Sequence, residues 1–370
     1  ADEADPNGKS GAGEIYVVFG GTSVGNSGTF ELSSLNGSNG FVIYVEQGDR
    51  LGRSVSNAGD INHDGIDDLI IGNEWANSNG ASYVVFGDTN VGNSGTFELS
   101  SLNGSNGFVI HGLEEGDFFG KSVSNAGDIN GDGIDDLIIE AYRADRINET
   151  RDGASYVVFG GTNVGNSGTF ELSSLNGSNG FVIHGIDSYD ESRNAVSNAG
   201  DINHDGINDL IVGAPVADVN DESHVGQSYV VFGGTNVGGS GTLEVSSLNG
   251  SNGFVINGID AEDQVGFSVS NAGDINNDGI DDLLIGTSNA GENYVVFGNA
   301  NHAPTLTSEI PDQNTTTGSS VSWDISSNFT DIDVGDTLTY TATNLPTGLS
   351  LDTGTGIISG TVADSAIATH

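Results

Sequence analysis

One acidic stretch returns four times along the chain and limits its fold more than any other feature. The copies, about 70 residues apart, are GDINHDGIDDLIIG from Gly59, GDINGDGIDDLIIE from Gly127, GDINHDGINDLIVG from Gly200 and GDINNDGIDDLLIG from Gly273. In step with them, YVVFG occurs five times and SSLNGSNGFVI four times. A regular period of this kind indicates copies of one supersecondary unit that stack on each other.

The blocks that follow each acidic stretch predict short β-strands. They are rich in β-branched and aromatic residues, are too short for helices, and are separated by Gly and Asn. Four such strands per repeat are typical of a β-propeller blade, whereas the coils of a β-solenoid, the alternative, are usually shorter. We therefore predict an all-β fold of four complete units, preceded by the second half of a fifth unit in the first 20 residues.

The acidic loop has the residue types of a calcium site. Oxygens at alternate positions of a tight loop point to one centre, and Gly65 permits the positive φ that the turn requires. Carboxylate and carbonyl oxygens are hard ligands that select Ca²⁺. In the first copy these oxygens would come from Asp60, Asn62, Asp64, the Ile66 carbonyl and Asp68.

Comparison of the four copies indicates which loop positions contact metal. The eighth position is Asn208 in the third copy, whereas the ninth remains acidic as Asp209, so the eighth is expected to lie outside the metal shell. The fourth position varies among His, Gly and Asn, so His63 and His204 are expected to face solvent. The alternative is that Asp and Asn only form turns. Four complete copies of D-x-N-x-D-G-x-x-D argue against that alternative, and apolar Ile71 at the twelfth position excludes an EF-hand.

Short motifs around the loops carry a family resemblance. Phe119-Gly120 and Gly213-Ala214-Pro215 match the two elements for which the FG-GAP repeat is named, while other units have Leu51-Gly52 or Val265-Gly266 at the first element. About residues 1 to 300 therefore resemble the FG-GAP β-propellers of integrin α-subunits and of secreted bacterial, especially cyanobacterial, proteins. Such propellers usually have seven blades. The chain would then be a piece of a longer array, which we favour, a ring closed by an incomplete blade, or a ring completed by a partner chain.

The resemblance also implies which residues bind metal. In this family the loop joins the first two strands of a blade and binds Ca²⁺, so about four ions are expected. The implied ligands are Asp60, Asn62, Asp64, Ile66 and Asp68; Asp128, Asn130, Asp132, Ile134 and Asp136; Asp201, Asn203, Asp205, Ile207 and Asp209; and Asp274, Asn276, Asp278, Ile280 and Asp282.

A second domain is expected after the repeats. Residues 1–300 form the repeat region, and the proline-containing segment NANHAPTLTSEIPDQ leads into residues 301–370. The hairpin LPTGLSLDTGTGIISGT resembles that of bacterial Ig-like and cadherin-like modules, which implies a partial Ig-like β-sandwich. Asp331, Asp333 and Asp336 are either surface turn residues, the interpretation we favour, or ligands of a further Ca²⁺.

Charge and motif content exclude several functions. With a formal charge of −44 the chain should repel nucleic acid and anionic membranes, and no apolar run is long enough for membrane insertion. No H-E-x-x-H motif or His/Cys cluster occurs, so we expect no enzyme activity. Trp75 and Trp323 are far apart in sequence, which argues against an aromatic sugar platform.

These observations predict a secreted or cell-surface protein. The expected function is calcium-dependent adhesion or the assembly of an extracellular matrix, with the propeller as a binding scaffold. Its partners would be calcium, an extracellular protein or glycan, and copies of itself. The alternative is a non-catalytic or carbohydrate-binding portion of a larger secreted hydrolase or toxin. Adaptation to high salt is a further explanation of the acidic composition that does not exclude either function.

Overall fold

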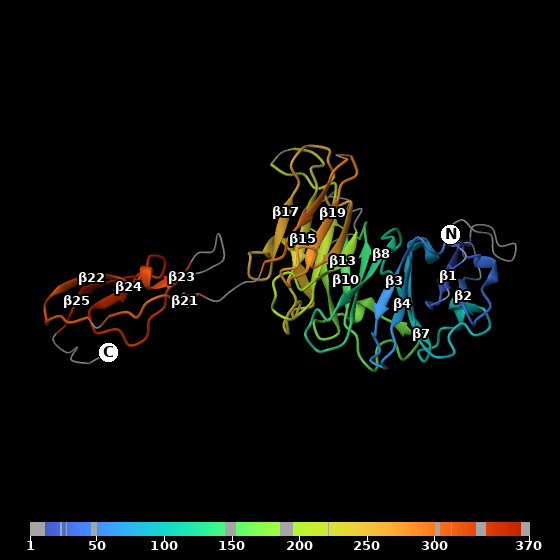
Figure 1. Cartoon of the computed structure of the whole chain (residues 1–370), viewed down its shortest axis with the longest axis horizontal. Helices are drawn as coiled ribbons and strands as arrows, with labels where there is room; N and C mark the ends of the chain where they lie inside the picture. The colour runs from blue at the N-terminus through green and yellow to red at the C-terminus, as the bar shows by residue number, and fades with distance from the viewer. Residues whose placement is uncertain are drawn as a thin grey trace. The chain divides into compact units, whose positions relative to one another are not determined.

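The computed structural model divides the chain into two compact units, Ala1–Asn299 and Ala300–His370. The residues that it describes are 12–22, 24–26, 28–45, 50–144, 153–185, 195–220, 222–289, 291–299, 304–311, 313–330 and 338–363. Both units consist of β-strands joined by turns and short 3₁₀ helices, so the all-β prediction is confirmed (Figure 1). Asp331, Asp333 and Asp336 lie outside the described residues.

Three complete blades form the centre of the first unit. In each, four strands of one repeat pair antiparallel in chain order, and a short strand that joins another blade lies between the third and the fourth. The strands are β3 (Ser54–Gly59), β4 (Asp68–Asn73), β5 (Ala81–Val85) and β7 (Gly107–His111); β8 (Phe119–Gly127), β9 (Asp136–Ala141), β10 (Ala154–Val158) and β12 (Gly180–His184); and β13 (Val196–Gly200), β14 (Asp209–Ala214), β15 (Gln227–Val231) and β17 (Gly253–Asn257).

The partial blade at the N-terminal end and the first two complete blades also receive an edge strand from the next repeat, which the sequence did not predict. The Gly/Asn/Ser segments were expected to be turns, but they contain β6 (Thr96–Glu98), β11 (Thr169–Phe170) and β16 (Thr242–Glu244). These strands pair parallel with β2 (Gly40–Tyr44), β7 and β12 of the preceding blades. The 3₁₀ helices are η2 (Leu32–Ser34), η3 (Ala76–Ser78), η4 (Leu99–Ser101), η5 (Leu172–Ser174), η6 (Val245–Ser247) and η7 (Ser326–Asn328).

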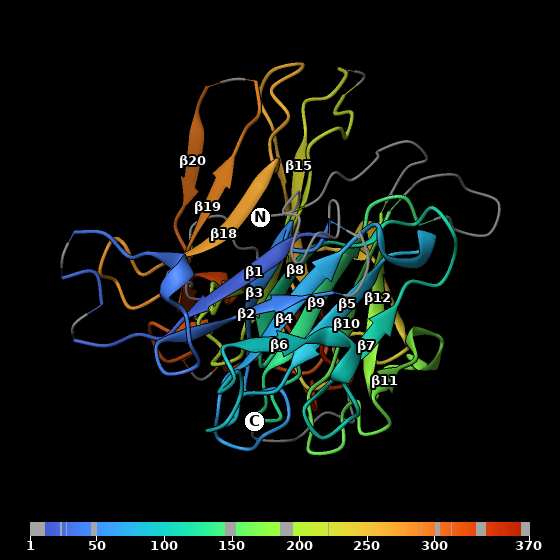
Figure 2. The same ribbon diagram turned by 90° about the vertical axis from the view of Figure 1, so that its right-hand side faces the viewer.

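The blades at the two ends of the array are incomplete within the described residues. At the N-terminal end, β1 (Glu14–Val18) and β2 (Gly40–Tyr44) form the outer half of a blade with β6. At the other end, β18 (Ser268–Gly273), β19 (Asp282–Gly286) and β20 (Asn293–Val296) form a three-stranded sheet, drawn in orange in Figure 2. The structure therefore has the four predicted acidic loops and the partial first unit, but the fourth unit is not the complete blade that the repeats predicted, because it has three strands within the described residues.

Apolar side chains of successive blades pack together in four clusters. Between the first two complete blades, Ile70 and Val84 are fully buried and Val123 nearly so. Their equivalents Leu284 and Val295 in the last blade are 43% and 44% exposed, because no further blade covers them within the described residues. Burial of a blade thus depends on the blade that follows it.

Glycine is required where the Gly/Asn/Ser segments cross a phenylalanine of the preceding blade. In the best-packed example Gly165 has a φ of 63°, and a Cβ there would lie 2.1 Å from the ring of Phe108. The same arrangement joins Gly92 to Phe41 and Gly238 to Phe181. A side chain at these positions would meet both backbone strain and a steric clash.

The second unit contains two small sheets. β22 (Ser320–Asp324) pairs antiparallel with β25 (Ile357–Thr361), which also pairs with β24 (Leu349–Leu351). β21 (Thr305–Leu306) pairs with β23 (Phe329–Thr330). The rings of Phe329 and Tyr340 meet edge to face at 6.0 Å. The unit has the strand-rich character expected of an Ig-like module.

Candidate metal centre

Each acidic loop connects the first and second strands of a blade. A β-bulge before the loop shifts the strand register between Asn57 and Gly59, and the Asn57 Oδ1 accepts a hydrogen bond from the Gly59 N–H at 2.8 Å. The same bulge precedes the second, third and fourth loops. It turns the chain out of the sheet so that the next nine residues can close on themselves.

The first aspartate organises the backbone of the loop. Asp60 Oδ1 accepts from the N–H of Asp64 at 2.8 Å, and Oδ2 accepts from the N–H of Gly65 at 2.9 Å. Equivalent bonds occur in the other three loops. Gly65 has a φ of 89°, as its predicted role requires. The aspartate and glycine of the motif are therefore explained by the fold as well as by metal binding.

The ninth aspartate is buried at the base of the loop. Asp68 Oδ2 accepts from the N–H of Ile61 at 3.2 Å, and Oδ1 accepts from that of Gly87 at 2.7 Å. The ninth residues are Asp68, Asp136, Asp209 and Asp282, each no more than 1% exposed. Two N–H groups stabilise each carboxylate without neutralising its charge.

Burial changes the acidity of these carboxyl groups. It raises the pKa of Asp68 to about 7, and the hydrogen bond from Gly87 only partly opposes this effect. Burial also raises the pKa of Asp136 to about 8 and that of Asp209 to about 7. In each case the first and fifth aspartates of the same loop add repulsion. A divalent cation would favour the ionised form and remove this penalty.

The third and fifth positions supply further oxygens. The Asn62 Nδ2 donates to the Asp64 Oδ2 at 3.1 Å, and the Asn62 Oδ1 is buried without a hydrogen-bond partner. A buried amide oxygen without a partner is costly, and a cation would satisfy it. Together with the carboxylates it forms the all-oxygen set that Ca²⁺ prefers. The residues of the loop therefore fit this ion.

The carboxylates are turned toward the loop backbone, so the cage is not already assembled. Within the described ranges, no three acidic or histidine side chains converge as a metal cluster. The reason is visible in the first loop, where Asp60 and Asp64 each accept bonds from N–H groups of their own loop. The structure nevertheless brings the five predicted residues of each loop together in one nine-residue turn.

The two positions that were predicted not to contact metal behave differently from each other. At the fourth position, His63 and His204 are exposed, as predicted, and have φ values of 60° and 59°. Asn277 has a φ of 63°, and Gly131 one of 75°. This left-handed geometry accounts for the mixture of His, Asn and Gly. The eighth position, by contrast, makes contacts with the neighbouring blade that the sequence did not indicate.

Aromatic and cationic side chains gather at the opposite ends of the blades. Phe118 lies between Trp75, at 5.2 Å, and Tyr142, at 5.1 Å, with Arg143 5.1 Å from the rings of both Phe118 and Tyr142. Arg53 and Lys121 pair with the buried Glu74 at 2.7 and 3.2 Å. With Arg50 over Trp75, this aromatic–cationic cluster holds every lysine and arginine of the described residues.

The position of Trp75 in the sequence suggested an isolated side chain, but in the structure Trp75 belongs to this cluster. Its partner Phe118, which in turn contacts Tyr142, belongs to the following repeat, so the contact depends on how the blades pack. Phe118 also has a φ of 56°, an uncommon conformation for a bulky residue. The sequence feature that could have indicated this cluster is that an aromatic or cationic residue replaces other residues of the repeat at the positions of its members.

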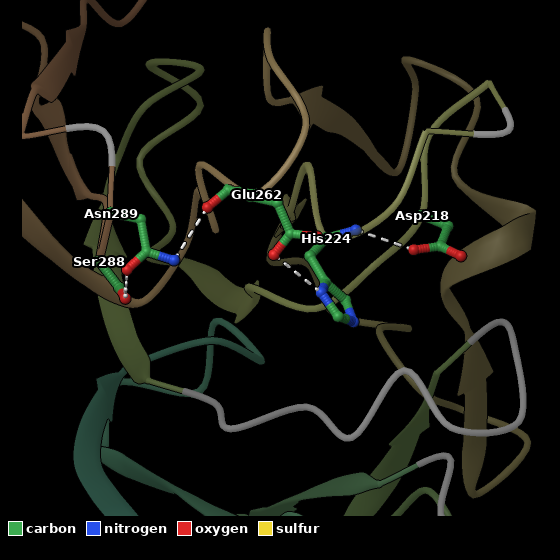
Figure 3. Close-up of polar contacts among 5 residues, drawn as sticks. All are labelled: Asp218, His224, Glu262, Ser288 and Asn289. Atoms are coloured by element: carbon green, nitrogen blue, oxygen red, sulfur yellow. Dashed lines mark hydrogen bonds and ion pairs between the residues drawn. The ribbon is translucent and has the colours of Figure 1, made fainter.

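Figure 3 shows a second group of polar contacts, between the last two blades. His224 Nδ1 lies 3.3 Å from Glu262 Oε2, and the backbone N–H of His224 donates to Asp218 Oδ1 at 2.9 Å. Asn289 Nδ2 donates to the Glu262 carbonyl at 3.0 Å. The His224 and Glu262 side chains are exposed, and the contacts join loops of adjacent blades. These contacts therefore connect the two blades.

Comparisons with known families match both units. Residues 51–85, 119–158 and 193–231 match the FG-GAP repeat, and residues 303–370 match the family described as Putative Ig domain. The loop from Gly273 lies outside the matched ranges, although its hydrogen bonds repeat those of the others.

Several curated proteins are similar to the first unit. Integrin alpha-PS3 of Drosophila melanogaster is 30% identical over 198 residues, which are 50% of this chain and 15% of that protein. Integrin alpha pat-2 of Caenorhabditis elegans is 28% identical over 251 residues, 67% of this chain and 19% of that protein. Phosphatidylinositol-glycan-specific phospholipase D of Dictyostelium discoideum is 28% identical over 196 residues, 50% and 19% respectively. The chain thus spans less than a fifth of each of these relatives and carries integrin α-like FG-GAP repeats followed by an Ig-like domain.

Proposed function

We propose that the chain is a calcium-stabilised binding scaffold of the cell surface or extracellular matrix, acting in adhesion or assembly and not in catalysis. The observation that carries this proposal is the repeated loop, which holds a buried carboxylate at its base in all four copies and, in the first copy, a buried amide oxygen without a hydrogen-bond partner. The similarity to integrin α-subunits supports adhesion. No helix in the described part of the chain is long and apolar enough to cross a membrane.

The loop residues would hold the ion as follows. The first, third, fifth and ninth side chains would supply oxygens, and the seventh residue would supply its carbonyl. In the first loop these are Asp60, Asn62, Asp64, Asp68 and Ile66. Calcium, when bound, supplies positive charge that offsets the repulsion among these side chains. The loop then fixes the two strands that it joins, and the propeller presents a rigid face to its partner.

Metal content tests the proposal directly. If the four loops are sites, purified protein dialysed against millimolar calcium should carry about four Ca²⁺ per chain by elemental analysis. Asp136→Asn should reduce this number by one, because it removes the buried carboxylate of the second loop. Fewer than two ions per wild-type chain would contradict the four-site assignment.

The aromatic–cationic cluster favours a second candidate, a carbohydrate-binding portion of a larger protein. Aromatic rings stack on sugars, and the cations would attract the carboxylate or sulfate groups of an acidic glycan, against the negative charge of the rest of the chain. Trp75 is 44% exposed and therefore accessible.

An array of acidic and neutral glycans tests this candidate. Binding of sulfated or uronic-acid glycans should fall about tenfold in Trp75→Ala and remain in Trp323→Ala, which alters the other unit. Absence of glycan binding by wild-type protein would leave the adhesion scaffold as the better explanation. The similarity to a phospholipase D supports the other alternative, a non-catalytic region of a larger hydrolase. A catalytic signature in the flanking sequence would identify the chain as part of such an enzyme.

A further inference from the structure

The eighth residue of the second, third and fourth acidic loops contacts the loop of the preceding blade. Asp135 Oδ2 accepts a hydrogen bond from the backbone N–H of Asp60 at 3.0 Å, although the two residues are 75 positions apart. The same bond joins Asn208 Oδ1 to the N–H of Asp128 at 3.1 Å and Asp281 Oδ2 to the N–H of Asp201 at 3.0 Å. The bond therefore recurs at all three junctions between consecutive loops.

A glycine makes room for this contact at each junction. A Cβ on Gly59 would lie 2.3 Å from the Asp135 carboxylate, and one on Gly200 would lie 2.3 Å from that of Asp281. By contrast, Gly273 of the last loop has no neighbour within 4 Å. The glycine before each of the first three loops is therefore explained by the close approach of the next blade.

A second bond holds the same part of the loop. The Ile61 carbonyl accepts from the N–H of Gly161 at 2.8 Å. The Ile129 carbonyl accepts from Gly234 at 2.9 Å, and the Ile202 carbonyl accepts from Asn299 at 3.1 Å. The first two residues of each of these loops are thus tied to the following blade through side chain and backbone.

From this repeated contact we propose that the eighth residue is a latch that couples calcium binding between adjacent blades. The latch fixes the backbone of the first aspartate, whose carboxylate in turn holds the fifth and sixth residues of its loop. Ordering one loop by calcium therefore helps to order the loop before it. Because coupling of binding free energies is reciprocal, calcium in the earlier loop also favours the latched state of the later one.

The two ends of the array provide internal contrasts. Asp67 occupies the eighth position of the first loop, where no acidic loop precedes it, and it is exposed, whereas Asp135, Asn208 and Asp281 are half-buried. At the other end, no further blade follows the loop of Asp274 within the described residues, and Asp274, Ile275 and Asn276 are exposed, whereas their equivalents in the first three loops are buried or half-buried. We therefore expect this fourth loop to require the highest calcium concentration.

The latch rests on the proposed calcium function and is tested by a substitution that acts on the neighbouring loop. Calcium is titrated into the full chain, and hydrogen exchange is followed by mass spectrometry in peptides covering residues 59–72, 127–140 and 200–213. Asp135→Ala should raise the calcium midpoint for protection of the first loop about tenfold, as expected for loss of a hydrogen bond to a charged acceptor. The second loop, whose ligands are intact, should shift by no more than the first, because the coupling between the two loops is reciprocal.

Two variants serve as matched controls. Asp135→Asn retains an acceptor, as Asn208 does naturally, and should leave the midpoint of the first loop unchanged. Asp67→Ala alters the same loop position where no preceding loop is present, and should leave all midpoints unchanged. A larger effect of Asp135→Ala on its own loop than on the first loop would overturn the latch. If calcium protects none of the loops in wild-type protein, the proposed function fails instead, so the two failures are distinguishable.

Discussion

Removal of calcium is expected to unfold or loosen the FG-GAP unit while the Ig-like unit stays unchanged. A ligand that binds only the native state stabilises it by about 2.7 kcal/mol per site at a hundredfold excess over Kd, so four sites would contribute on the order of 10 kcal/mol. That is comparable to the whole stability of a typical domain. The second unit has strands but none of the repeated loops.

Hydrogen exchange with and without EDTA measures this effect. Protection should be lost in β4, β9 and β14, which follow the loops directly, and should persist in β22 and β25. The Ig-like strands serve as the control within the same molecule. Unaltered protection of the blade strands after complete removal of calcium would mean that calcium does not stabilise the fold and acts, if at all, as a bridge to a partner.

A second large effect is expected from pH, and saturating calcium should abolish it. The raised pKa values of Asp68, Asp136 and Asp209 mean that the folded calcium-free protein binds protons that the unfolded chain, with an ordinary Asp pKa, does not. The stability of the calcium-free protein should therefore fall as pH rises from about 4 to about 8, with each pKa unit worth about 1.4 kcal/mol. Calcium binding requires the ionised carboxylates and so displaces these protons, which means that stability in saturating calcium should stay nearly constant over the same range.

Urea unfolding at pH 5 and pH 8.5 compares the two forms. Calcium-free protein should be prepared by EDTA treatment and then desalted, because EDTA chelates weakly at low pH. The formal charge of −44 adds a general repulsion that also grows with pH, so the measurement should be repeated at high NaCl, which screens exposed charges more than buried ones. Parallel pH dependences with and without calcium would contradict the assignment of these aspartates.

The sequence predicted what is local to one repeat. Alternation of oxygen-bearing side chains, Gly65 at the turn and the acid retained as Asp209 beside Asn208 all lie within nine residues, so four copies allowed each position to be compared. The strand blocks were equally visible, because their composition repeats. The structure supports these predictions since the loop closes through its own backbone N–H groups.

Features that depend on neighbouring repeats were not predictable in the same way. The eighth residue was recognised as a non-ligand, but its partner is 75 to 80 positions away and is a backbone N–H that has no sequence signature. The aromatic–cationic cluster likewise joins Trp75 to Phe118 and Tyr142 across a blade junction. The edge strands were mistaken for turns because their Gly, Asn and Ser flanks dominate the composition.

The borrowed edge strands have a consequence for biosynthesis. As the chain leaves the ribosome, the sheet that contains β7 is completed only when β11 of the next repeat has been synthesised. A blade that receives such a strand therefore has an unpaired edge until one further repeat has been made. The segments that supply these strands are identical over TNVGNSGTFELSSLNGSNGFVI from Thr89 and from Thr162. The sequence of the strand therefore does not specify which blade it joins. Only its position in the nascent chain keeps a blade from pairing with the identical segment of another chain that is being synthesised on the same polysome.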